Sequence, residues 1–408
     1  MEGGRMGYDE PGRESADTAS GIPASVLENV FDDPAHGEPG RDRFAVHVGW
    51  EVLLLAVLAV VAYLLWQEAP DTLRGDGLRR LLVDAVVLGL LVFAAGLSLR
   101  TAAVNLAIGP AAVAAALHVA EQGDRGLVAA AGPALVAAAL GGLVLALAVV
   151  VLHVPSWAAS LAAAAGVIVF IEQRSAPVLP QGGYDPTRDA LYLVVGFAAV
   201  AVLAGLFAAL RPVRRLIGRF RPVVDPARRR GVVAGVVAGA ALIVSTVLAA
   251  SAGVLLGTGD AGPVAPVTGL DWTVLAVGTS LLAGTSAFGR RGGIFGTLLA
   301  VSLVTLVMAN LRVEGHSVSR WAVGAAALGV GLVATRLVET YGRPRPGASA
   351  TDVTPDPDGR ISSGWAVQRA DPIGEWPPAL PAHHAENPVD PWNVPQWDAG
   401  RRWDSDDR

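Results

Sequence analysis

Residues 128–153 read VAAAGPALVAAALGGLVLALAVVVLH, a run without a single charged side chain. A helix needs about 20 apolar residues to cross the roughly 30 Å hydrocarbon core of a bilayer. Similar runs recur on both sides of this one, so the sequence predicts an all-α, polytopic membrane protein with about ten transmembrane or broken helices. The predicted segments are 44–66, 80–98, 104–120, 128–153, 155–173, 190–210, 231–257, 272–289, 294–311 and 320–337.

The composition agrees with a membrane protein. Hydrophobic residues make up 52% of the chain and charged residues only 16%, against about 25% charged in soluble domains. Glycine contributes 48 of the 408 residues. Small residues of this kind let membrane helices approach one another closely.

Two residue types are missing, and their absence excludes several kinds of chemistry. The chain has no Cys, so disulfide frameworks, zinc fingers and thiolate catalysis are ruled out. All 31 basic residues are Arg, so the chain has no P-loop Lys and no Schiff-base Lys. We therefore expect no cofactor, no metal site, no enzymatic activity and no ATP hydrolysis by this chain alone.

Charge divides the chain into three regions. Residues 1–43 carry a net charge of −6, residues 44–338 carry +6, and residues 339–408 carry −5. The pattern predicts a membrane domain between two disordered, acidic tails. The second tail is rich in Pro and Asp, and it could instead dock on a partner through its five tryptophans, which are Trp365, Trp376, Trp392, Trp397 and Trp403.

The distribution of Arg predicts the orientation in the membrane, because cytoplasmic loops carry an excess of basic residues. With the N-terminus inside, the cytoplasmic loops hold 16 Arg and the external loops hold 8. Eight of the 16 lie between Arg211 and Arg230. We therefore expect a multi-pass protein of the plasma membrane with both termini in the cytoplasm.

Two segments interrupt the apolar pattern in a way that indicates function. Thr101–Pro110 places a polar Asn105, then Gly109 and a proline, inside otherwise apolar sequence. Gly and Pro break helices, and Asn can pair with a freed backbone group or with a polar solute. The second segment, 284–297, surrounds a pair of arginines with glycines and predicts a tight turn between two packed helices.

Together these segments resemble the permease subunits of ribose-type sugar ABC importers, in the branched-chain amino-acid and sugar permease superfamily. Ala103-Val-Asn105-Leu-Ala-Ile-Gly109-Pro matches the spacing of one family element, and Val154-Pro-Ser-Trp157 matches a second. Ala283-Gly-Thr-Ser-Ala-Phe-Gly-Arg-Arg-Gly-Gly-Ile-Phe-Gly-Thr297 follows a third almost residue for residue. The resemblance covers residues 44–338 and neither tail.

The resemblance implies a permease with two structurally related halves that works by alternating access. Its partners would be separate ABC ATPase subunits, an extracytoplasmic solute-binding protein, a second permease chain and the lipid bilayer, with no nucleic acid. Residues near the substrate pathway would be Asn105, Gly109, Thr285 and Ser286. The turn and its helix contact would be shaped by Gly284, Gly289, Gly292, Gly293 and Gly296.

The cytoplasmic loop 211–230 departs from the family pattern, which has a Glu-Ala-Ala-containing coupling helix at this place. The loop is rich in Arg and Pro and lacks that motif. It could couple to an ATPase through Arg215, Leu216, Arg219 and Phe220, or it could only fix the topology. A degenerate permease that acts as a scaffold or regulatory subunit without transport is therefore the alternative function.

Asp84 is a carboxylate within a predicted span, where charge is costly unless it faces protein or water. Arg80 lies one turn earlier on the same predicted helix. The sequence leaves two interpretations open: Asp84 pairs with Arg80 near the external interface, or it lines the pathway.

Overall fold

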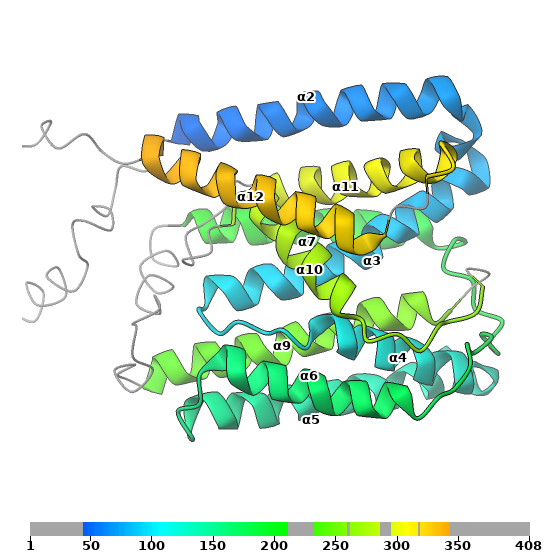
Figure 1. Cartoon of the computed structure of the whole chain (residues 1–408), viewed down its shortest axis with the longest axis vertical. Coiled ribbons are helices and arrows are strands. Elements are labelled where there is room, and N and C mark those ends of the chain that lie inside the picture. The colour runs from blue at the N-terminus through cyan, green and yellow to red at the C-terminus, as the bar shows by residue number, and fades with distance from the viewer. Residues whose placement is uncertain (1–43, 211–231, 259–261, 286–294, 317–318, 343–408) are drawn as a thin grey trace, which may run out of the picture. The chain divides into compact units, whose positions relative to one another are not determined.

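A computed structural model describes residues 44–210, 232–258, 262–285, 295–316 and 319–342. Within these residues the chain is all-helical, with ten α-helices and no strand (Figure 1). They are α2 (Phe44–Glu68), α3 (Gly75–Arg100), α4 (Ile108–Gln122), α5 (Leu127–Val150), α6 (Ser156–Glu172), α7 (Ala190–Ala209), α9 (Val232–Leu256), α10 (Leu270–Leu282), α11 (Gly296–Val313) and α12 (Arg320–Gly342), with short 3₁₀ turns η2 (Pro70–Leu73) and η3 (Gly123–Arg125).

The helices form an all-helical fold that is typical of membrane proteins. Six of them, α2, α3, α5, α7, α9 and α11, are long and apolar enough to cross a bilayer. Each of the ten predicted segments overlaps one helix, but ten membrane crossings and two related halves stay predictions. The two predicted disordered tails and the loop 211–230 lie outside the described residues.

Burial separates inner helices from outer ones. In α3 and α9, 61% and 56% of the apolar window is buried inside the protein, compared with 11% in α2, 22% in α5 and 17% in α7. Because apolar side chains are stable in lipid, the exposed faces of α2, α5 and α7 are suited to contact with the bilayer. Helices α3 and α9 form the centre against which the short helices pack.

Glycines bring the central helices into backbone contact. A methyl group at Gly253 or Gly257 of α9 would overlap the backbone carbonyls of Ala112 and Ala116 in α4. The two glycines are four residues apart and so lie on one face of α9. This is the small-xxx-small arrangement by which membrane helices pack without bulky side chains between them.

Helices α10 and α12 pack side by side and run in the same direction. A Cβ atom on Gly324 would lie 2.9 Å from the backbone nitrogen of Leu275, and one on Gly331 would lie 2.7 Å from that of Leu282. The residue numbers of these contacting pairs increase in the same direction along both helices, so the two helices are parallel. Glycine is required at these positions because any side chain would push the helices apart.

Helices α4 and α10 are short, and this shortness creates the candidate site. They contain 15 and 13 residues, which correspond to lengths of about 22 and 20 Å. Neither length covers the roughly 30 Å of hydrocarbon. The chain therefore enters both helices through non-helical connections that reach into the bundle, residues 101–107 before α4 and the segment ending at Gly269 before α10.

Candidate functional site

Asn105 holds the first connection in place. Its side chain is buried, and its Oδ1 accepts a hydrogen bond from the backbone N–H of Ala107 at 3.0 Å, just before α4 begins. Its Nδ2 donates to Ser245 Oγ of α9 at 3.1 Å, and that hydroxyl donates to the carbonyl of Ala94 in α3 at 3.0 Å. One amide therefore links α3, α4 and α9, and its oxygen and its nitrogen are both used within the protein.

Gly109, the second residue of α4, lies where the start of α4 meets the start of α10, a contact that we call the crossing. Its backbone N–H donates to Thr273 Oγ1 at 3.0 Å, and the same hydroxyl donates to the carbonyl of Leu106 at 3.2 Å. A methyl group at Gly109 would overlap the carbonyl of Gly269, whose φ is +74°. The start of α4 thus meets the start of α10 within the protein.

The other predicted pathway residues occupy a different place. Helix α10 ends at Leu282, and Gly284 follows with φ +89°. Thr285 is buried, and its backbone N–H donates to the carbonyl of Ser280 at 3.1 Å. A methyl group at Gly296 would overlap the carbonyl of Ala283, so Gly296 begins α11 directly against the end of α10.

Several predicted residues lie outside the described residues. In the turn these are Ser286, Gly289, Gly292 and Gly293, and in the coupling loop they are Arg215, Leu216, Arg219 and Phe220. Of the four predicted pathway residues, the structure places Gly109 at the crossing and Asn105 in the connection just before α4. It places Thr285 at the end of α10, next to Ser280 and near Gly96 of α3.

Two adjacent residues of α2, which the sequence analysis missed, hold the ends of the α10–α11 connection. Trp50 Nε1 donates to the carbonyl of Leu282 at 2.9 Å. Glu51 Oε1 accepts from the backbone N–H groups of Phe295 and Gly296 at 2.7 and 2.9 Å. Helix ends leave such groups without partners, and a carboxylate is favoured at a helix N-terminus. In the sequence, Glu51 could have been singled out because it is the one acidic residue within the apolar segment 44–66.

Asp84 lines a small cleft between α3, α10 and α11. Its Oδ2 forms an ion pair with Arg312 of α11 at 3.2 Å, so the structure pairs it across helices instead of with Arg80. The cleft has a volume of about 30 Å³. It is lined by Asp84, Val87 and Leu88 of α3, Trp272 of α10, and Thr305, Met308 and Arg312 of α11.

A second ion pair lies beside the same tryptophan. Arg320 Nε of α12 contacts Asp271 Oδ2 of α10 at 2.6 Å, and the guanidinium carbon lies 4.7 Å from the centre of the Trp272 ring. The Asp271 side chain is only 12% exposed, whereas that of Arg320 is 38% exposed. Trp272 is therefore fixed between a guanidinium group and the cleft.

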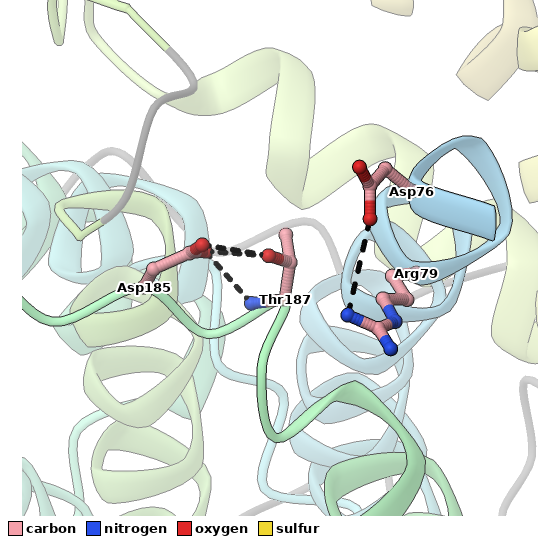
Figure 2. Close-up of polar contacts among 4 residues, drawn as sticks. All are labelled: Asp76, Arg79, Asp185 and Thr187. Atoms are coloured by element: carbon pink, nitrogen blue, oxygen red, sulfur yellow. Dashed lines mark hydrogen bonds and ion pairs between the residues drawn. The ribbon is translucent and has the colours of Figure 1, made fainter.

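Figure 2 shows two local polar contacts, one in the loop before α7 and one at the start of α3. Asp185 accepts hydrogen bonds from the hydroxyl and backbone N–H of Thr187 at 2.7 and 2.9 Å. These bonds hold the pKa of Asp185 below its usual value, and Arg188 adds a smaller effect. Asp76 and Arg79 pair at 3.8 Å on the neighbouring helix.

The same loop is joined to two other connections. Val178 and Val264 exchange two backbone hydrogen bonds, of 2.9 and 2.8 Å. Arg174 binds both carboxylate oxygens of Glu121 at the end of α4, at 2.5 and 2.9 Å. We call this end of the bundle, with residues 69–74, 173–189 and 262–268, the loop face.

The described residues contain no group of three or more His, Asp or Glu side chains that could hold a metal ion. No protein-family model matches the chain, and no curated protein or solved structure matches it either.

Proposed function

We propose that the chain is the membrane-spanning permease subunit of an ABC importer for a small polar solute such as a sugar. The observation that carries the proposal is the contact between the starts of two short helices, α4 and α10, at Gly109, where each helix is entered through a non-helical connection inside a bundle of apolar helices. Non-helical backbone at membrane depth is tolerated only where it is buried in protein or lines a cavity. Transporters place their pathways at such broken helices.

The partner chains in this proposal are those that the family resemblance implies. With no Lys it has no P-loop Lys, so ATP would be hydrolysed by separate ATPase subunits below the membrane. A solute-binding protein would deliver the solute to the loop face, and a second permease chain would complete the pathway. In this proposal the loop face is extracytoplasmic, and both tails lie in the cytoplasm of a cell whose plasma membrane holds the complex.

Uptake measurements test the proposal. Cells or proteoliposomes that contain the chain with its candidate ATPase and solute-binding protein are given a panel of labelled sugars. Uptake should need all three components and ATP, and the isolated chain should show no ATPase activity. ATP hydrolysis by the isolated chain would contradict the proposal.

The loop 211–230 decides between a transporter and the scaffold alternative. The double change Leu216→Ser, Phe220→Ser leaves every Arg in place, so a loop that only fixes topology should tolerate it. If the loop couples to an ATPase, membrane insertion should be unchanged while ATPase association and uptake fall. If association and uptake are both unaffected, the loop is a topological signal and the coupling assignment is wrong.

A further inference from the structure

We propose that the end of the bundle opposite the loop face holds a binding site for a phosphate group, formed by Arg100 at the end of α3 and Ser280 in the last turn of α10. The phosphate belongs either to the headgroup of an anionic lipid or to a soluble phosphate, and a binding experiment distinguishes the two sources. The site does not depend on transport. Neither Arg100 nor Ser280 lies in the three elements that resemble the permease family.

Buried polar atoms without hydrogen-bond partners gather around this end of α10. Within the described residues, five buried side-chain atoms have no partner, and three of them are Arg100 Nε, Ser280 Oγ and Thr335 Oγ1. Thr335 follows Gly331 by one turn of α12, and Gly331 lies against Leu282 at the end of α10. Burying a polar group without a hydrogen bond is costly. A cluster of such groups at one place therefore indicates a site for a ligand.

Ser280 differs from comparable residues of the bundle in the use of its hydroxyl. Thr279, Thr305 and Thr246 each donate to the carbonyl four residues earlier in their own helix, at 2.7, 2.8 and 3.0 Å. Such bonds are common for hydroxyls within helices. Ser280 makes no such bond although it is only 1% exposed, and its Oγ would lie 3.1 Å from a Cβ atom on Gly96 of α3. The hydroxyl therefore faces α3 and can donate to a ligand there.

Arg100 is the last residue of α3 and lies one turn after Gly96, on the same face of the helix. Helix side chains tilt toward the N-terminus of their helix, which directs the Arg100 side chain back toward Gly96 and so toward Ser280. Arg100 lies 25 residues after the start of α3, about 38 Å along the axis. Because the hydrocarbon layer is about 30 Å thick, Arg100 stands at the depth where lipid headgroups and water begin.

A phosphate group fits these donors. The guanidinium presents its N–H groups in a planar fork that can bind two phosphate oxygens at once, and the Ser280 hydroxyl can donate to a third. None of the ion pairs among the described residues includes Arg100. Its positive charge is therefore available to an anion that approaches from the membrane surface.

Binding to the purified full-length chain tests the site. The melting temperature is measured in an uncharged, phosphate-free detergent with phosphatidylglycerol, with diacylglycerol of the same acyl chains, or with inorganic phosphate. At least one phosphate compound should raise the melting temperature, and diacylglycerol should not. A rise with the lipid alone assigns the phosphate to a headgroup, and a rise with inorganic phosphate assigns it to a soluble source. If neither raises the melting temperature, or if diacylglycerol acts as well as the phospholipid, the proposal is wrong.

Two variants locate the binding at Arg100 and Ser280. Arg100→Gln should weaken binding of the active phosphate compound about tenfold or more, and Ser280→Ala about threefold or more, because each removes a donor to the phosphate. The matched controls are Arg79→Gln near the start of α3 and Ser251→Ala, which removes a hydroxyl that donates within its own helix at 2.9 Å. Both controls should bind as the unaltered chain does. Normal binding by Arg100→Gln and Ser280→Ala would place the phosphate elsewhere and overturn the site.

Stability without ligand distinguishes binding from a structural role of Arg100. If Arg100 served only to complement the dipole of α3, Arg100→Gln would lower the melting temperature in the absence of phosphate. A ligand site predicts that removing a buried, unpaired guanidinium leaves this temperature unchanged or raises it. If one variant does not fold, the other and its control still test the site. The measurements need no ATPase and no transported solute, so their failure and the failure of the proposed function are separate outcomes.

Discussion

The absence of a side chain at Gly109 allows the starts of α4 and α10 to meet. The backbone of Gly109 lies against Gly269 and Thr273, and no space remains for even a methyl group. Asn105, four residues earlier, uses both ends of its amide to keep the same segment in place. Small or polar residues therefore occupy the crossing and the connection before it, where backbone approaches backbone.

Gly109→Ala should destabilise the protein by about 3 kcal/mol or more, because overpacked backbone contacts must separate. Gly132→Ala in α5 is the matched control, since a Cβ atom there has nothing within 4 Å. That change should be neutral or stabilise by up to about 1 kcal/mol. Thermal unfolding in detergent measures both. Equal melting temperatures for the two variants would contradict the crossing.

Asp185 provides a pH-dependent test at the loop face. Its folded-state pKa is lowered, first by the Thr187 hydroxyl, so its stabilising effect is present above the ordinary Asp pKa and is lost as pH falls through the lowered pKa. Thr187→Val should raise the pKa of Asp185 toward its ordinary value, and Thr187→Ser should not. Carboxyl NMR titration of Asp-labelled protein measures both. A titration that is the same in all three proteins would refute the assignment.

At the scale of elements, one outer helix fixes the ends of two others. Trp50 and Glu51 of α2 supply partners to the last turn of α10 and the first turn of α11. The α10–α11 connection is therefore held by a helix more than 200 residues away in the sequence. Parallel packing of α10 on α12 through glycines completes this group of helices.

Glu51→Ala should cost about 0.5–2 kcal/mol, the usual cost of losing an N-terminal cap. Glu51→Gln should cost less, because an amide oxygen can still accept the two backbone N–H groups. Glu68→Ala at the exposed far end of α2 is the control and should have little effect. Hydrogen exchange at Phe295 and Gly296 reports the loss locally. Unchanged exchange in Glu51→Ala would show that the cap is unimportant.

Substitutions at two glycines of α12 distinguish the effect of helix packing on stability from the effect of helix propensity. Gly331→Ala would bring a methyl group within 2.7 Å of Leu281 and Leu282, whereas a Cβ atom at Gly329 has nothing within 4 Å. Gly331→Ala should therefore lower the melting temperature, while Gly329→Ala should leave it unchanged or raise it slightly. The two variants carry the same substitution on different sides of one helix. The same effect from both would contradict the observed α10–α12 contact.

At the scale of the whole molecule, a contact between two loops shows which connections lie at the same end of the bundle. The backbone pairing of Val178 with Val264 requires the connections before α7 and before α10 to lie on one side of the membrane. The excess of Arg in the other loops predicts that this side is extracytoplasmic. Reporters inserted at 182 and 265 should therefore agree with each other, and a reporter after 345 should give the opposite, cytoplasmic signal. An external signal from the fusion after 345 would reverse the orientation.

The local sequence by itself determined where the helices lie. In lipid each segment must satisfy its own backbone hydrogen bonds, so every apolar run of sufficient length forms a helix. The predicted segment 128–153 corresponds to α5, Leu127–Val150. Helix-breaking residues also located the connection before α4, where Asn105 lies, and the start of α4 at Gly109. The predicted segment 272–289 was too long, because α10 ends at Leu282, before Gly284 with its positive φ.

Only the tertiary structure decided which residues meet. Asp84 pairs with Arg312, Glu51 caps α11, and Gly109 contacts Thr273, although each pair is separated by more than 160 residues. An apolar run indicates that a helix forms, but it does not specify which neighbouring helix that helix packs against. Packing register depends on how complementary surfaces fit across the whole bundle. The crossing at Gly109 and the charged cleft at Asp84 therefore depend on the tertiary structure, in which residues from distant segments meet.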